Sequence, residues 1–66
     1  MDIDYQLKRV HSYLMSEGFP YHSVSVIYRG DDLGLHALFI SEVKDKVTEV
    51  IRGRLKAYGF GYSFVG

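Results

Sequence analysis

Hydrophobic residues near the start of the chain recur at the spacing of an α-helix. Over residues 3–17, one stripe is formed by Ile3, Leu7, Val10 and Leu14. Steps of three and four residues place these side chains on one face of a helix. Asp2 or Asp4 is suited to cap its first turn. Gly18 fits the left-handed position after the last turn, and Pro20 prevents continuation.

Alternating residues predict two strands in the middle of the chain. Residues 22–29 are rich in β-branched side chains, and residues 34–40 form a second apolar run. The four residues Gly30–Leu33 between them are typical of a turn, so we expect an antiparallel hairpin. The register that follows pairs Arg29 with Gly34, Tyr28 with Leu35, Val26 with Ala37 and Val24 with Phe39.

A second helix and a third strand are predicted in the remaining residues. Ser41 is suited to cap a helix over residues 42–58, and Gly59 is suited to end it. The apolar stripe of this helix comprises Val43, Val47, Val50, Ile51, Leu55 and Tyr58. Residues 60–65 alternate again, with an aromatic residue at every second position, which predicts a strand.

The order of these elements, α-β-β-α-β, defines the expected fold class. Residues 1–66 are expected to form a single small α+β domain, because no linker or repeat divides them. Two helices on one face of a sheet make a two-layer sandwich, and we expect a three-stranded, mainly antiparallel sheet. The pattern leaves open whether the third strand is central, at an edge or exchanged between subunits.

Size and composition indicate a protein that gains stability from a partner. A domain of 66 residues buries only about 60% of the surface that its unfolded chain exposes. Cysteine is absent, which excludes disulfides and cysteine-ligated metals as additional support. Association with another chain is the remaining common form of support.

The charge balance argues against a strong general attraction to nucleic acid or membranes. Eight basic and eight acidic residues cancel over the whole chain. Residues 1–49 carry five basic and eight acidic residues, a net −3, whereas residues 50–66 carry +3 from Arg52, Arg54 and Lys56. The longest apolar run, Ala37–Ile40, is too short to span a bilayer. We expect a soluble cytoplasmic protein without membrane association.

One face of the predicted hairpin is more apolar than a solvated sheet face should be. It carries Ile27, Leu38 and Ile40, with Arg29 and His36 beside them. If helices cover only the other face, this surface is expected to bind another protein or a second copy of the chain. Isolated surface apolar residues, or a register shifted by one residue, would explain the same pattern.

Two features of the second helix do not fit its apolar stripe. Gly53 lies inside the helix, where glycine costs roughly 1 kcal/mol relative to alanine. Ala57 lies on the same flank, and two small residues there would admit another backbone, from the first helix or from a second copy. Arg54 falls near the centre of the stripe. It either extends its stem over the core, pairs with a carboxylate or serves a binding site.

Aromatic residues are concentrated in one short segment, where Tyr58, Phe60, Tyr62 and Phe64 are spaced by small residues. This segment resembles the aromatic strand signature of RNA-recognition domains, whose alternate rings stack on bases from an open sheet face. The resemblance implies a single-stranded nucleic-acid contact, with phosphate contacts from Arg52, Arg54 and Lys56. The opening basic residue of the signature is Tyr58 here, and that family's first strand has no counterpart.

Other candidate chemistry is sparse. Zinc requires three or four converging ligands, and His11, His22 and His36 lack the spacing of a metal motif. No phosphate-binding glycine loop is present, and a chain of 66 residues has little room for a catalytic pocket. We therefore expect no metal, no cofactor and no enzymatic activity.

These observations favour a small protein–protein interaction module that self-associates. Regulators, inhibitors and accessory factors are of this kind, including some that phages encode. The expected interface is the apolar face of Ile27, Leu38 and Ile40, with Arg29 and His36 at its rim. The alternative is a protein that binds single-stranded nucleic acid through its C-terminal aromatic and basic residues.

Overall fold

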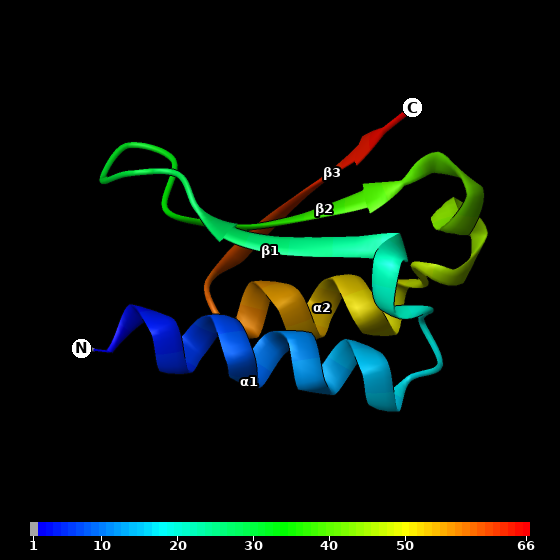
Figure 1. Cartoon of the computed structure of the whole chain (residues 1–66), viewed down its shortest axis with the longest axis horizontal. Coiled ribbons are helices and arrows are strands. Elements are labelled where there is room, and N and C mark those ends of the chain that lie inside the picture. The colour runs from blue at the N-terminus through cyan, green and yellow to red at the C-terminus, as the bar shows by residue number, and fades with distance from the viewer. Residues whose placement is uncertain (1) are drawn as a thin grey trace.

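Two helices and three strands form two layers in the computed structural model, which describes residues 2–66 (Figure 1). Both helices lie on the same side of the sheet. Along the chain, the elements are α1 (Ile3–Ser16), the 3-10 helix η1 (Tyr21–Ser23), β1 (Val24–Tyr28), β2 (Leu35–Ile40), the 3-10 helix η2 (Ser41–Lys46), α2 (Glu49–Ala57) and β3 (Phe60–Val65). The predicted α+β fold and its α-β-β-α-β order are confirmed.

The central strand of the sheet is β2, with β1 and β3 at the two edges. β1 runs antiparallel to β2 with Tyr28 opposite Leu35, so the predicted hairpin register is confirmed. A hydrogen bond of 2.8 Å from the Arg29 N–H to the Gly34 carbonyl closes the turn. β3 runs parallel to β2. The sheet therefore contains one antiparallel and one parallel pair, and the third strand lies at an edge.

The first helix begins at the predicted residue and ends at Ser16, one residue before the predicted end. Ile3, predicted to lie in its apolar stripe, is exposed. The Tyr5 N–H donates to the Asp2 carboxylate over 3.3 Å at its N-terminus. Gly18 follows the helix with a φ of 94°, a conformation that residues with a side chain disfavour. Val10 and Leu14 are buried. Within residues 2–66, neither α1 nor α2 is long and apolar enough to cross a membrane.

The helix predicted over residues 42–58 is in fact two separate helices, η2 and α2. Thr48 caps α2, because its hydroxyl oxygen accepts a hydrogen bond of 3.4 Å from the Ile51 N–H. Ser41, which the sequence suggested as the cap, instead donates its hydroxyl proton to the Val65 carbonyl over 3.1 Å. The capping prediction was therefore wrong, and Ser41 joins the end of β2 to the end of β3.

The apolar spacing conceals the break between the two helices. Val43, Val47 and Ile51 follow one another at intervals of four residues, and all three are buried. The stripe continues although Val47 has a ψ of 80°, outside the helical region. Val50, predicted to lie in the stripe, is 71% exposed. Its side chain points about 100° away from that of Ile51, because consecutive helical residues differ by that rotation.

Gly53 and Arg54 lie on the exposed surface of α2. A Cβ atom at Gly53 would meet no atom within 4 Å. The predicted approach of the first helix to Gly53 is therefore wrong, and contact with a second copy there stays a prediction. Arg54 does not lie in the buried stripe, which its neighbour Leu55 occupies. The Arg54 guanidinium instead lies 5.8 Å from the centre of the Tyr13 ring.

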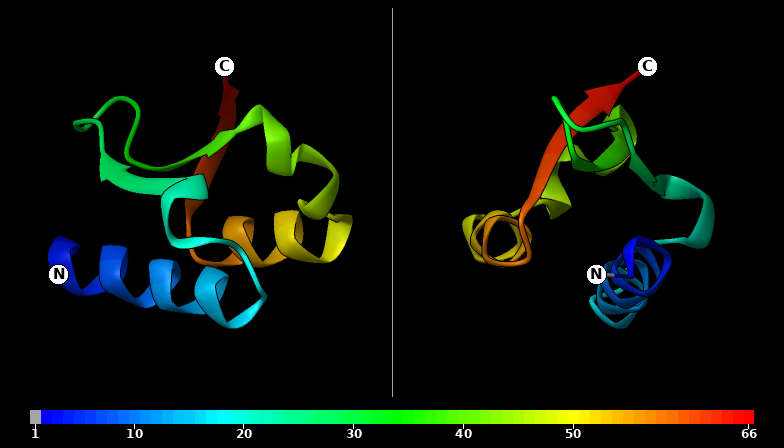
Figure 2. Two further views of the ribbon diagram at one scale, coloured as in Figure 1. Left: turned by 45° about the vertical axis from the view of Figure 1, so that its right-hand side comes forward. Right: turned by 90° about the vertical axis from the view of Figure 1, so that its left-hand side faces the viewer.

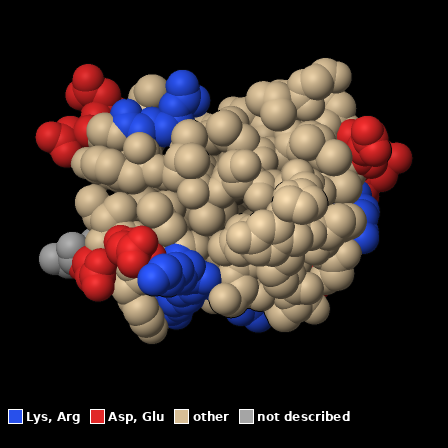
Figure 3. Space-filling model, viewed as in Figure 1, with Lys and Arg blue, Asp and Glu red and all other residues tan. Residues whose placement is uncertain are grey.

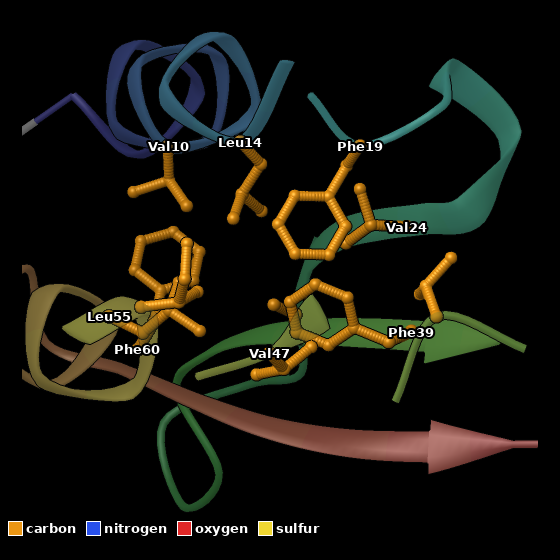
Figure 4. Packing of buried hydrophobic residues seen from close by; sticks show 11 residues of the cluster. Val10, Leu14, Phe19, Val24, Phe39, Val47, Leu55 and Phe60 are labelled. Atoms are coloured by element: carbon orange, nitrogen blue, oxygen red, sulfur yellow. The ribbon is translucent and has the colours of Figure 1, made fainter. Parts of the chain in front are cut away.

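The hydrophobic core lies between the helices and the sheet (Figure 4). Phe39 is fully buried, and its ring centre lies 5.4 Å from that of Phe19 and 5.8 Å from that of Phe64. Leu14 and Leu55 reach this cluster from α1 and α2. Burying one such side chain contributes about 1.5–3 kcal/mol. The covered face of the sheet is thus a main source of the stability of the fold.

Candidate interaction surface

The sheet has one face that no helix of residues 2–66 covers. Both α1 and α2 pack on the opposite face, as the end-on view makes clear (Figure 2). Side chains alternate between the two faces along each strand, and the buried Ala37 and Phe39 mark the covered face. The other face, which we call the open face, is formed by Ser25, Ile27, His36, Leu38, Ile40, Gly61, Ser63 and Val65.

Leu38 lies at the centre of the open face, on the central strand and between serines of β1 and β3. Ile27 lies one row away on β1, opposite His36. Ile40 and Val65 are partners one row away in the other direction. Val65 is 47% exposed, and the other three are partly buried. We call Ile27, Leu38, Ile40 and Val65 the open-face patch.

His36 is the polar centre of this face. A hydrogen bond of 2.8 Å joins His36 Nε2 to Ser63 Oγ on the neighbouring strand. A Cβ atom at Gly61 would lie 3.0 Å from His36 Nδ1, so the imidazole occupies the space above this glycine. The β2–β3 register runs through Gly61 without interruption. This glycine makes room for the His36 ring to reach Ser63.

Charged groups lie outside the open face. None of its eight residues is acidic, lysine or arginine. Arg29 is exposed just after β1, at the rim that the sequence predicted. Beyond it, the Tyr28 hydroxyl donates to the Asp31 carboxylate over 2.6 Å. This hydrogen bond, with a smaller contribution from desolvation, raises the pKa of Tyr28 above its ordinary value. The Asp31 carboxylate is thus hydrogen-bonded at the end of the hairpin.

The aromatic residues of β3 point toward the helices and not toward the open face. Phe60, Tyr62 and Phe64 are the β2 partners of Leu35, Ala37 and Phe39, which belong to the covered face. Phe60 is 5% exposed, and Tyr62 and Phe64 pack against the same core. The rings do not form the row on an open sheet face that stacks on bases in the nucleic-acid hypothesis.

The basic residues predicted to contact phosphate also diverge. The Arg52 side chain donates from Nε to the Val47 carbonyl over 3.2 Å, and its guanidinium lies 5.5 Å from the centre of the Tyr62 ring. Arg54 lies toward α1, next to Tyr13. Lys56 is exposed. Arg52 thus lies with Tyr62, whereas Arg54 lines a separate groove with Tyr58 and Phe60. The three cations and the four aromatic residues are therefore not gathered on one surface.

The three histidines lie in two separate places. His36 is on the open face, whereas the rings of His11 and His22 lie 5.1 and 5.2 Å from that of Tyr21. These three aromatic side chains line a groove of about 640 Å³ between α1 and β1. In the view of Figure 1, charged residues lie mainly toward the two ends of the molecule (Figure 3). No group of three histidine or carboxylate side chains within residues 2–66 is arranged to hold a metal ion.

Sequence reasoning missed three residues of the open face, namely Gly61, Ser63 and Val65. Their parity along β3 was visible, since they alternate with the aromatic residues. What was missing was the side of the sheet to which the aromatic residues point. That side depends on the pairing of β3 with β2, which a local pattern does not contain.

Comparisons with protein families, curated proteins and solved structures found no significant match for this chain. The geometry of its surfaces is therefore the basis for a functional proposal.

Proposed function

We propose that this protein is a small interaction module that binds a second copy of itself through the open face of its sheet. The observation that carries the proposal is the open-face patch. Four apolar side chains lie on one face of a three-stranded sheet, and α1 and α2 lie on the opposite face. Ile40 also packs against the core, whereas Ile27, Leu38 and Val65 lie outside it. Contiguous exposed apolar surface of this kind is typical of interaction sites.

The size of the chain supports a second copy as the occupant. A 66-residue domain exposes a large share of its apolar surface, and association is a common way for such domains to gain stability. Two open faces packed face to face resemble the two layers of a β-sandwich, with sheets about 10 Å apart. The pairing would convert a two-layer domain into a four-layer dimer with a second core.

Electrostatics also favour pairing between identical faces. In a two-fold dimer the same surface meets itself, so any charge on it would approach a like charge. The eight strand residues of the open face include no acidic residue, lysine or arginine, and Arg29 lies at its rim. Two of its polar side chains, His36 and Ser63, are joined by a hydrogen bond of 2.8 Å. Association would therefore desolvate few unpaired polar groups, which keeps its cost low.

The test is a charge placed at the centre of the patch. We expect Leu38→Glu to abolish self-association, because an unpaired carboxylate would be buried in the interface. The monomer should remain folded, because Leu38 points away from the core. Sedimentation velocity measures the association, and circular dichroism measures the fold.

Val50→Glu is the matched control. Val50 is an apolar residue that is 71% exposed on α2, so the same substitution there should leave self-association unchanged. Loss of association in both variants would indicate a general effect of charge. Wild-type association in Leu38→Glu would contradict the proposal.

A further inference from the structure

A second surface, unrelated to the open face, lies between the two helices. A groove of about 420 Å³ opens there, within the size range of small-molecule sites. Val10 and Phe60, which are 1% and 5% exposed, form part of its lining. Arg9 of α1 and Arg54 of α2 line it as well. The groove thus combines an apolar surface with a cation from each helix.

The two arginines belong to a reciprocal arrangement of the helices. Each helix carries an arginine four residues before a tyrosine, as Arg9 with Tyr13 and Arg54 with Tyr58. Residues at this spacing share one helix face. The Arg9 guanidinium lies 4.7 Å from the centre of the Tyr58 ring, and that of Arg54 lies 5.8 Å from Tyr13. The centres of the two tyrosine rings are 6.0 Å apart, with the rings tilted by 60°, so the four side chains are neighbours between the helices.

The tyrosine rings lie beside both guanidiniums without neutralising them. Arginine stacks through its flat face, which leaves the N–H groups at its edge free to donate. Among residues 2–66 the one ion pair is between Lys8 and Asp4, at 3.1 Å. Burial and, to a lesser degree, the nearby Glu17 raise the pKa of Tyr13. Glu17 makes no ion pair with Arg9 or Arg54, so both cations are available to a ligand.

We propose that this groove binds a small organic phosphate, with the phosphate between Arg9 and Arg54 and a flat apolar group over Ala57 and Tyr58, which line the groove and keep exposed surface. A phosphate monoester presents three terminal oxygens, enough to accept hydrogen bonds from two guanidinium forks. Gln6 also lines the groove, and its side-chain amide adds a neutral donor. The apolar lining distinguishes an aryl ester from free phosphate.

Phenyl phosphate is the probe, and its binding to the full chain is measured by two-dimensional NMR titration. We expect it to bind about 10-fold more tightly than inorganic phosphate, because the ring buries apolar surface. We also expect it to bind about 10-fold more tightly than benzyl alcohol, which lacks the anion. The largest shifts should fall on Gln6, Arg9, Arg54 and Tyr58. Equal affinity for phenyl phosphate and inorganic phosphate, or shifts elsewhere, would overturn the proposal.

Charge-removing variants locate the site. Arg9→Gln and Arg54→Gln should each weaken phenyl phosphate binding at least about 10-fold, as expected for loss of a charged hydrogen-bond donor. Lys56→Gln removes the same charge from an exposed residue of α2 that does not line the groove, and it should change affinity less than about 2-fold. An equal loss of affinity in all three variants would indicate a general effect of net charge, and it would contradict binding in this groove.

Two further variants separate this site from folding and from self-association. Arg9→Lys keeps the charge but loses the fork, so its binding should fall between those of wild type and Arg9→Gln. Leu38→Glu lies on the opposite side of the sheet from the helices and should bind phenyl phosphate as wild type does. Full binding by Arg9→Gln would contradict the proposal even if self-association is confirmed.

Discussion

The two faces of the central strand β2 differ in what covers them. Ala37 and Phe39 point toward the helices and have no exposed surface. His36, Leu38 and Ile40 alternate with them and keep part of their surface exposed. Both faces are rich in apolar residues, although the helices of residues 2–66 cover only one of them. An apolar pattern along a strand therefore identifies surfaces that are suited to burial. It does not determine which element or partner covers them.

Each face then has a different task in our interpretation. The covered face stabilises the monomer through the cluster around Phe39. The open-face patch stabilises a dimer: Ile27, Leu38 and Val65 lie outside the core cluster of the monomer, whereas Ile40 also packs against that cluster. If this division is correct, substitutions on the covered face change the free energy of unfolding, and substitutions on the open face change the association constant.

Phe39→Ala should have the largest effect on unfolding. Truncating a buried phenylalanine costs about 3–5 kcal/mol through lost burial and the cavity that remains. Phe39 contacts both Phe19 and Phe64, so neighbouring side chains cannot close the cavity cheaply. Urea unfolding followed by circular dichroism measures the change. A loss of less than about 1 kcal/mol would place the centre of the core elsewhere, since surface substitutions have effects of that size.

Thr48→Ala should have a smaller effect on the free energy of unfolding. It acts on α2, which covers the sheet, and not on the sheet itself. Removing the cap of α2 should lower the free energy of unfolding by about 1 kcal/mol, while Ser41→Ala should lower it less. Association should not change in either variant. The same urea experiment tests the break between η2 and α2. A loss well below about 1 kcal/mol for Thr48→Ala would contradict its role as the cap of α2.

Gly53→Ala should have the smallest effect, and of opposite sign. The added methyl group meets no atom within 4 Å, and alanine is preferred over glycine in a helix by about 0.5–1 kcal/mol. We expect a gain in unfolding free energy of that size and unchanged association. This variant also tests whether the surface of α2 takes part in self-association. Weaker association in Gly53→Ala would identify the surface of α2, and not the open face, as the contact between copies.

Local patterns predicted the parts of this fold that local chemistry determines. The turn at Gly30–Leu33 set the hairpin register, and with it the position of Ile27, Leu38 and Ile40 on the open face. A glycine in the left-handed conformation ended α1, as expected from its sequence.

Longer-range relations could not be predicted in the same way. The break before α2 was hidden because Val47 and Ile51 continue the apolar spacing across it, although Thr48 was available as a cap. The place of Val65 in the open-face patch depends on the parallel pairing of β3 with β2. That pairing follows a connection through two helices, which a period of two residues does not encode.

The most direct test of the central claim is the mass of the protein in solution. Light scattering after size exclusion, over a wide range of concentrations, measures it without a label. Self-association through the open face predicts twice the chain mass of 7.6 kDa at high concentration, with a return toward 7.6 kDa on dilution. A mass of 7.6 kDa at every concentration would contradict the claim that a second copy covers the open face.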